Sequence, residues 1–444
     1  MKYIPKFISV ACIIVIALMH SVQAQDLPRR VYLGIRMENL AEDVKKVMGI
    51  QQVNGVLISE VLKGSTAEKA GFKKGDILTR INGKELSRTQ DVLSVLSVNK
   101  AGDAFSFNLL RNKRAVSGKS TFYAFPKESY GDIQVSYLQC KTEIGLQRII
   151  VQKPAGKRKK PLIVFLGGIG CYSLDSPLDT GRAELQLLNK LVRTGFISAR
   201  IEKPGIGDNA GFCKPCNEVS FIEELNGYIA AIKTLKTDPD IDSNRIFIFG
   251  HSMGGIFAPL VARELSIKGI VAYGTIGSSF IEYLAKTRRT IAEAYQMTPI
   301  ETDQLIRDFC VCGHFYFEEN MTTAQAALKK PVCAEYLQLF DLRSREYNKE
   351  LYALNIPELW STYTGNVLLL WGSSDYIASH DDHEIIFNTL QFYKKSNAEL
   401  SVVEKMDHGM LHAESYQASS SNPGKYNPVI GSVVENWLST TMNK

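Results

Sequence analysis

The 444-residue sequence lacks the features that mark several specialised classes of protein. It has no internal repeat and no low-complexity segment, which excludes repeat architectures and biased-composition tracts. Beyond residue 19 no apolar run approaches the roughly 20 residues that a membrane-spanning helix needs. The densest basic run, residues 157–160, contains no aromatic side chain, so a solvated loop is favoured there over a nucleic-acid-binding patch. No nucleic-acid partner is therefore expected.

The first 24 residues differ from the rest of an otherwise ordinary globular composition. Hydrophobic residues make up 45% of the chain, and its length allows two or more domains. Lys2 and Lys6 precede an apolar run, residues 7–19, and small or permissive side chains at 22–24 precede Gln25. This pattern predicts a signal peptide, residues 1–24, and export to the periplasm or the medium. An uncleaved N-terminal anchor is the alternative.

Seven cysteines follow the predicted signal peptide, and in an oxidising compartment some should pair and at least one should stay free: Cys140, Cys171, Cys213, Cys216, Cys310, Cys312 and Cys333. Cys213 and Cys216 have the spacing of a redox motif but not its strand-to-helix context. A structural disulfide between them or a link to Cys171 is favoured. The cysteines of residues 310–333 and His314 could supply zinc ligands, but a simple disulfide is favoured. No metal and no cofactor is predicted.

Residues 29–112 have the strand and turn pattern of a small separate domain. Three motifs mark it: Tyr32-Leu-Gly-Ile35, Ala67-x-x-Ala-Gly71 and Gly75-Asp-Ile-Leu-x-x-Ile-Asn-Gly83, which ends in a hairpin signal. This order resembles a PDZ domain of the bacterial type found in periplasmic trypsin-like and tail-specific proteases. Residues 113–120 include few apolar side chains and are predicted to be a linker.

The PDZ resemblance implies a peptide-binding groove between the strand after Gly34 and the helix near residues 89–96. The backbone amides of Leu33, Gly34 and Ile35 would hold a terminal carboxylate while the peptide adds a strand to the sheet. A groove blocked by the neighbouring domain is the alternative.

From residue 121 to residue 444 predicted strands alternate with helices. An early antiparallel pair, near 133–139 and 147–151, precedes strands that are each followed by a helix, which predicts a mostly parallel sheet covered on both faces. Between about 278 and 363 the strand signal disappears. We expect this stretch to be a helical cap over the mouth of an active site. A helical element remote from the site is the alternative.

The strongest motif is the stretch Arg245-Ile-Phe-Ile-Phe-Gly-His-Ser-Met-Gly-Gly255. A buried strand runs into Gly-x-Ser-x-Gly and then directly into an apolar helical pattern, which is the context of a nucleophile elbow. The glycines give the turn room, and the hydroxyl of Ser252 projects from its tip. The amide of Met253, and those of Gly168 and Ile169 in the loop after an earlier strand, are the predicted oxyanion donors.

A serine nucleophile needs a base and an orienting acid. Strand 368–371 ends in a Gly-x-x-Asp turn that brings Asp375 to the edge where Ser252 lies, and the loop after the next strand brings His408 there. His412 is the competing base. Asp407 is expected to face solvent or to cap the following turn. His251 is expected to point away from the site.

Residues from about 130 to 440 thus resemble a serine α/β-hydrolase, nearest the branch of prolyl oligopeptidases, acylaminoacyl peptidases and dienelactone hydrolases. The elbow, Trp371-Gly-x-x-Asp375, Asp407-His-Gly409 and Pro204-Gly-x-Gly-Asp208 carry the resemblance. The sequence departs from the lipase and esterase pattern at Leu166, which stands where those enzymes have histidine, and this leaves the second oxyanion donor open.

These observations predict an exported serine hydrolase that cleaves an ester or amide bond through an acyl-enzyme, with the PDZ unit recruiting peptide or protein partners. The absence of a β-propeller slightly favours an esterase over a peptidase of the prolyl-oligopeptidase type, which is the first alternative. A binding or scaffold protein with an inactive hydrolase fold is the second alternative.

Overall fold

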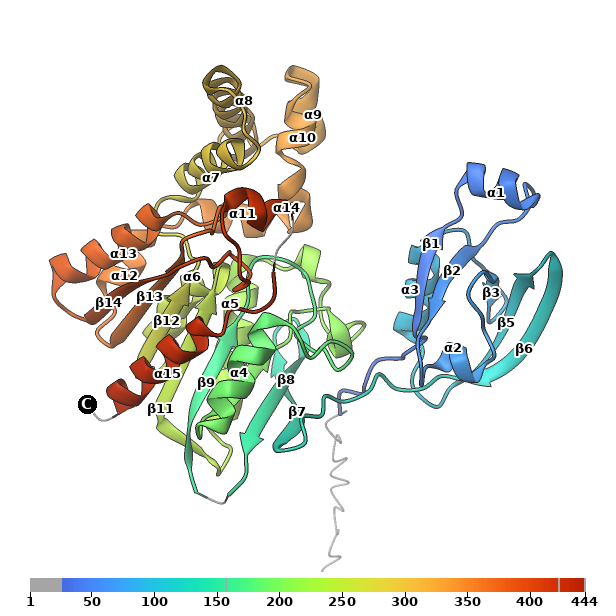
Figure 1. Ribbon diagram of the computed structural model, residues 1–444, viewed down its shortest axis with the longest axis horizontal. Coiled ribbons are helices and arrows are strands. Elements are labelled where there is room, and N and C mark those ends of the chain that lie inside the picture. The colour runs from blue at the N-terminus through green and yellow to red at the C-terminus, as the bar shows by residue number, and fades with distance from the viewer. Residues whose placement is uncertain (1–25, 157, 422–423, 443–444) are drawn as a thin grey trace, which may run out of the picture.

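Two β-sheets organise the chain, each at the centre of its own domain (Figure 1). The computed structural model describes residues 26–156, 158–421 and 424–442, so the predicted signal peptide, residues 1–24, lies outside the described residues. None of the helices in these ranges is long and apolar enough to cross a membrane.

The smaller sheet is antiparallel and six-stranded, with the order β1-β2-β3-β5-β6 and with β4 paired to β3. Its apolar face packs against α3 and around the aromatic side chains of β5, and β1 lies at its edge. The elements are β1 (Ile35–Asn39), α1 (Glu42–Met48), β2 (Val56–Val61), α2 (Thr66–Lys69), β3 (Ile77–Ile81), β4 (Lys84–Glu85), α3 (Thr89–Val98), β5 (Ala104–Arg111) and β6 (Arg114–Thr121).

The predicted linker, residues 113–120, is wrong, because most of it is strand β6. It pairs with β5 from Arg111↔Arg114 to Ala104↔Thr121. As an edge strand, β6 is largely solvated and needs few apolar residues. The sequence therefore shows no apolar pattern from which this strand could be predicted. Gly118 is required because the ring of Phe107 packs against it: a Cβ there would lie 2.4 Å from the ring.

The larger sheet has eight strands in the order β14-β13-β12-β11-β9-β10-β8-β7. The predicted early antiparallel pair is confirmed as β7 and β8, and from β10 to β14 neighbouring strands are parallel. This is the strand order of the α/β-hydrolase fold. The strands are β7 (Ile133–Thr142), β8 (Gly145–Pro154), β9 (Lys160–Leu166), β10 (Ile197–Ile201), β11 (Ile241–His251), β12 (Gly269–Tyr273), β13 (Asn366–Gly372) and β14 (Asn397–Val403).

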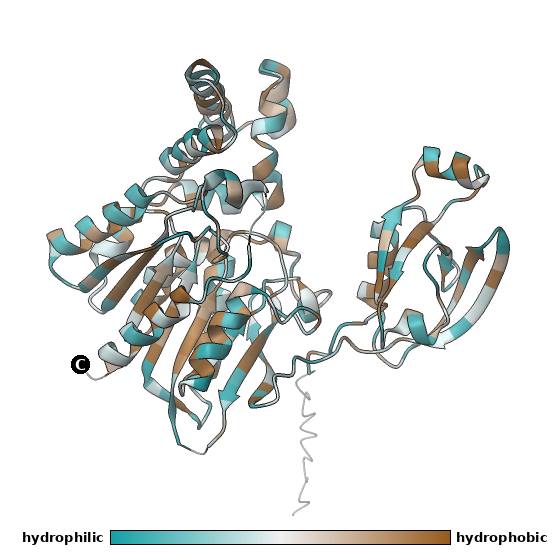
Figure 2. Cartoon of the chain, in the orientation of Figure 1, coloured by the Kyte–Doolittle hydropathy of each residue, from teal (hydrophilic) through white to brown (hydrophobic). Residues whose placement is uncertain are grey.

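Helices cover both faces of this sheet, because alternate strand residues are apolar on each side. The side chains of Leu162 and Val164 face one core with α5 (Phe221–Leu235), α6 (Met253–Glu264) and α13 (His380–Tyr393). Those of Ile163 and Phe165 face the other, with α4 (Ala183–Arg193) and α15 (Val429–Met442). Figure 2 shows the apolar strands between more polar helices.

Every element between β12 and β13 is a helix, and Figure 1 shows the first of these helices beyond the carboxyl edge of the sheet. Thr298 caps one of them as its sequence predicts, with its hydroxyl accepting from the amide of Glu301 (3.3 Å). The elements are α7 (Phe280–Ala294), α8 (Pro299–Phe317), α9 (Thr323–Lys329), α10 (Cys333–Tyr336), η3 (Gln338–Leu342), α11 (Arg345–Tyr352) and α12 (Ile356–Ser361).

Within the described residues two disulfides are formed, Cys171–Cys216 and Cys312–Cys333. The second is the simple disulfide predicted for the helical stretch, so the zinc alternative there is wrong. The first is the predicted link to Cys171, and it leaves Cys213 free and buried.

Candidate active site

Ser252 occupies the sharp turn between β11 and α6. Its φ of 55° and ψ of −120° are strained for a residue with a side chain, and neighbouring contacts hold it there. Its amide donates to the carbonyl of Tyr273 on the adjacent strand (2.9 Å). Gly254 makes the turn possible, because a Cβ at that position would lie 2.0 Å from the carbonyl oxygen of Leu166.

Asp375 and His408 meet at the same carboxyl edge, after β13 and β14. The Oδ2 atom of Asp375 lies 2.9 Å from Nδ1 of His408, while its Oδ1 accepts from the amides of Ile377 and Ala378 (both 2.9 Å). The carboxylate is fully buried and the imidazole is 21% exposed.

The pKa values of this pair move apart. Burial alone would raise the pKa of Asp375, but the charge and hydrogen bond of His408 and the two loop amides lower it. Burial would likewise lower the pKa of His408, but the charge and hydrogen bond of Asp375 raise it above its ordinary value. The carboxylate therefore stabilises an imidazolium and orients the ring so that Nδ1 carries a proton.

Two glycines show how close Ser252 and this pair lie to the surrounding loops. A Cβ on Gly274 would be 3.0 Å from both Asp375 Oδ2 and His408 Nδ1. A Cβ on Gly168 would be 3.7 Å from Ser252 Oγ. Gly274 directly follows Tyr273, whose carbonyl accepts from the Ser252 amide, so Asp375, His408 and Ser252 gather around one loop junction.

The rival residues lie elsewhere or have other partners. Asp407 is buried and caps the following turn, accepting from the amides of Gly409 (2.9 Å) and Leu411 (2.8 Å). His412 is half exposed, and its Nε2 lies 3.7 Å from Glu414.

The prediction that His251 points away is wrong. Its ring centre lies 5.0 Å from that of His408, and its Nε2 lies 2.8 Å from the His408 carbonyl oxygen. Loss of hydration, followed by the nearby charge of His408, lowers the pKa of His251 to about 4. The ring is thus neutral near neutral pH, and Nε2 carries its proton because a carbonyl can only accept.

The predicted oxyanion loop has an additional member, Tyr172. The Gly168 amide donates to the Tyr172 hydroxyl (3.0 Å), and the carbonyl of Ile169 accepts from Arg343 (2.8 Å). Burial raises the pKa of Tyr172 to about 12, so the hydroxyl keeps its proton and can donate it. Nothing in the sequence marked Tyr172, because it lies in an irregular loop outside any motif.

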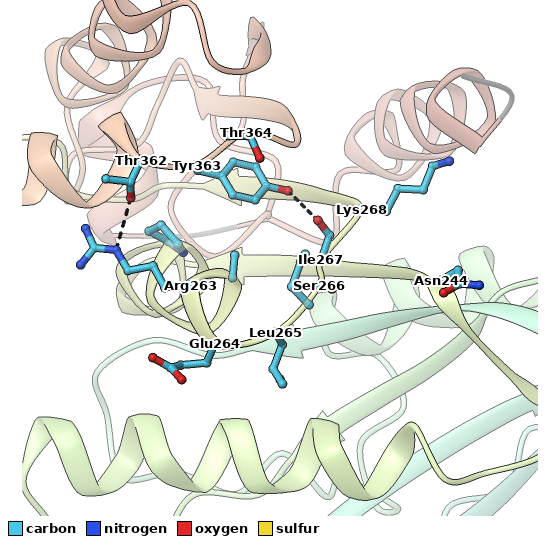
Figure 3. Close-up of a pocket in the computed structure, with 12 residues that line it drawn as sticks. Asn244, Arg263, Glu264, Leu265, Ser266, Ile267, Lys268, Thr362, Tyr363 and Thr364 are labelled. Carbon is cyan, nitrogen blue, oxygen red and sulfur yellow. Dashed lines mark hydrogen bonds between the residues drawn. The ribbon is translucent and has the colours of Figure 1, made fainter.

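Two surface hollows lie on the hydrolase domain, and neither is lined by Ser252, Asp375 or His408. One of about 770 Å³ lies at the end of α6 and the start of β12, around Arg263 and Tyr363 (Figure 3). That is the amino edge of the sheet, opposite Ser252. Another of about 740 Å³ borders the loop of His408 and is lined by Gly409, Arg182 and Lys425, among others.

The predicted PDZ carboxylate loop leads into the edge strand β1. The carbonyls of Leu33 and Gly34 accept from the amides of Ala67 and Leu62 (both 2.9 Å), and Gly34 has a φ of 70°. Ile35 begins β1, which pairs with β2 on one side. Among the described strands none pairs with its other side.

The fold and these sites define an α/β-hydrolase domain joined to a PDZ domain. The PDZ domain family matches residues 31–118. Over 93 residues the chain is 34% identical to the periplasmic pH-dependent serine endoprotease DegQ of Escherichia coli, and over 87 residues it is 37% identical to a probable periplasmic serine protease of Haemophilus influenzae. These matches cover 21% and 20% of this chain and 20% and 19% of those proteins.

Solved structures similar to the chain include peptidases and esterases. The acylaminoacyl peptidase of Pyrococcus horikoshii is 13% identical with a TM-score of 0.44, over 77% of this chain and 48% of that one. Acetyl xylan esterase 1 of Thermoanaerobacterium is 15% identical with a TM-score of 0.43, over 71% and 86%. The assignment of the fold rests on the strand order given above.

Proposed function

We propose that the protein is a serine hydrolase that cleaves an ester or amide bond through Ser252, His408 and Asp375. The observation that carries this proposal is the strained serine at an elbow beside a buried Asp–His pair. His408 takes the proton of Ser252 as the hydroxyl attacks the carbonyl carbon, and returns it to the leaving group. Asp375 holds the imidazole and stabilises its charged form.

The oxyanion that forms in this reaction needs donors that are in place before it appears. The first amide of α6, from Met253, is one. In the loop of Gly168 and Ile169, the Gly168 amide already donates to the Tyr172 hydroxyl. The hydroxyl of Tyr172 is therefore the second proposed donor to the oxyanion, in place of the Gly168 amide. Each such donor typically stabilises the transition state by about 3 kcal/mol.

We further propose that the protein is exported and that its PDZ domain recruits peptides with a free C-terminus. Two disulfides fit an oxidising compartment, and the relatives of the PDZ domain named above are periplasmic proteases. The edge strand β1 provides the backbone to which a peptide strand can add.

Labelling with a fluorophosphonate tests this proposal directly. Wild-type protein should be labelled and should hydrolyse short acyl esters, whereas Ser252→Ala should do neither. Ser266→Ala, an exposed serine at the opposite edge of the sheet, is the matched control and should behave as wild type. Labelling that survives in Ser252→Ala would refute the assignment, and parallel panels of esters and blocked peptides would separate the two substrate classes.

A further inference from the structure

Two segments connect the PDZ domain to the hydrolase domain, residues 27–32 and 122–128, which we call the neck. They run side by side and antiparallel. The amide of Phe125 donates to the carbonyl of Arg30 (2.8 Å), and the Arg30 guanidinium lies 3.9 Å from the centre of the Phe125 ring. The neck is therefore an ordered ribbon.

Arg29 anchors the neck to the hydrolase domain. Its side chain is 11% exposed, with Nη1 2.5 Å from Asp208 Oδ2 and Nη2 2.8 Å from Asp175 Oδ2. The carbonyls of Phe125 and Pro126 also accept from it (3.4 and 2.6 Å). Both carboxylates are almost completely buried. Asp208 has a second cationic partner, since Arg148 Nε lies 3.0 Å from its Oδ2. Asp175 is therefore the carboxylate that depends most on Arg29 to balance its charge.

Asp175 belongs to the loop that carries Tyr172. One residue further on, the amide of Ser176 donates to Glu128 Oε1 of the neck (2.8 Å). Glu128 is in turn paired with the fully buried Arg200. The neck thus holds this loop at two neighbouring points, three and four residues after the tyrosine whose hydroxyl accepts from the Gly168 amide.

The opposite side of Tyr172 is held by other parts of the chain. Cys171 is tied to Cys216, and the carbonyl of Ile169 accepts from Arg343. The hydrolase domain therefore holds the loop before Tyr172. It also holds the two residues directly after Tyr172, because Glu202 accepts from the Ser173 hydroxyl (2.7 Å) and the Leu174 amide (2.9 Å). The neck holds the next two residues.

We propose that Arg29 is a positioning residue for the oxyanion loop, so that the neck of the PDZ domain forms part of the catalytic architecture. The inference rests on the proposed hydrolase function. Loss of Arg29 frees Asp175 from its charge partner, lets the loop after Tyr172 shift, and moves the hydroxyl that is the second proposed donor to the oxyanion. Displacements of about 1 Å in such a position can cost about a hundredfold in rate.

The test measures kcat and KM on p-nitrophenyl acetate, with kcat expressed per site titrated by a fluorophosphonate. Arg29→Ala should lower kcat per titrated site by about tenfold or more with KM changed less than about twofold, and Arg29→Lys should recover part of the loss. Arg193→Ala is the control: this arginine forms an exposed ion pair with Asp132 (2.8 Å) and should leave both constants unchanged. A merely structural role would lower the number of titrated sites but not the kcat of each.

Asp175→Asn keeps the inference testable if Arg29→Ala does not fold, because asparagine keeps the shape and can still accept from the Tyr137 hydroxyl. It should reproduce the loss of kcat per titrated site. Unchanged kcat in either variant, with a labelled wild type, would overturn this inference alone. A wild-type protein that is neither labelled nor active would overturn the proposed function and this inference with it.

Discussion

Replacing His251 with phenylalanine should slow the reaction while leaving the protein folded, because His251 supports the segment that carries the proposed base. Its Nε2 donates to the His408 carbonyl, and no other donor to that carbonyl is present among the described residues. Phenylalanine preserves the ring that lies between Phe165 and Tyr273 but removes the donor.

The magnitude follows from the lost bond. A carbonyl left without a partner costs about 1–3 kcal/mol. If the His408 loop moves so that the carbonyl regains a partner, His408 is displaced and the cost appears as a higher activation barrier. A factor of ten in rate corresponds to about 1.4 kcal/mol, so the expected fall in kcat is about fivefold to 150-fold. KM should change little, because the hydrogen bond that is lost is made to His408, the proposed base.

The assay is steady-state ester hydrolysis per titrated site, with thermal unfolding measured in parallel. His251→Gln retains a donor of similar reach and should recover part of kcat. His412→Phe is the matched control, since this exposed histidine lies outside the site, and it also tests the competing choice of base. A kcat for His251→Phe within twofold of wild type, at equal stability, would show that the hydrogen bond does not position His408.

Two further predictions concern pH. For wild type, kcat/KM should fall as pH decreases through the pKa of His408, and the midpoint should lie above the ordinary value of 6.5 because Asp375 raises this pKa. Asp375→Asn should move the midpoint downward. A lower midpoint in wild type than in the variant would contradict the pairing of Asp375 with His408. Burial raises the pKa of Glu202 from 4.5 to about 7, so the free energy of unfolding should decline as pH rises between these values. The glutamine of Glu202→Gln does not titrate, so the difference in unfolding free energy between variant and wild type, measured with urea, should shift by about 3 kcal/mol in favour of the variant from pH 4 to pH 8.

The sequence predicted the sheet and its carboxyl edge well, because both depend on local pattern. Buried strands are continuous apolar runs, and parallel strands must deliver the residues that follow them to one edge. The positions of Ser252, Asp375 and His408 at that edge follow from this geometry alone. Strand β6 escaped detection because a solvated edge strand needs no apolar pattern.

The contacts of His251, Tyr172 and Arg29 could not be predicted for a different reason. Each joins residues whose meeting depends on how loops fold over the sheet edge. Arg29 binds Asp208, 179 positions away, and no local periodicity carries that pairing. His251 was predicted to point away because the alternation of side chains along a strand fixes only the face of the sheet on which a residue lies. It does not predict which loop from later in the chain packs against that residue.

The way in which the PDZ domain is attached follows from the residues that precede it. Leu27 is 5% exposed, and its carbonyl accepts from Arg148 on β8, so the hydrolase domain includes chain on both sides of the PDZ domain. The chain on both sides of the PDZ domain therefore contacts the hydrolase domain. Two antiparallel connections restrict its rotation more than a single tether would, since both must bend together. A peptide bound near Gly34, as proposed, would lie only a few residues from Arg29 along the neck, which contacts the loop of Tyr172.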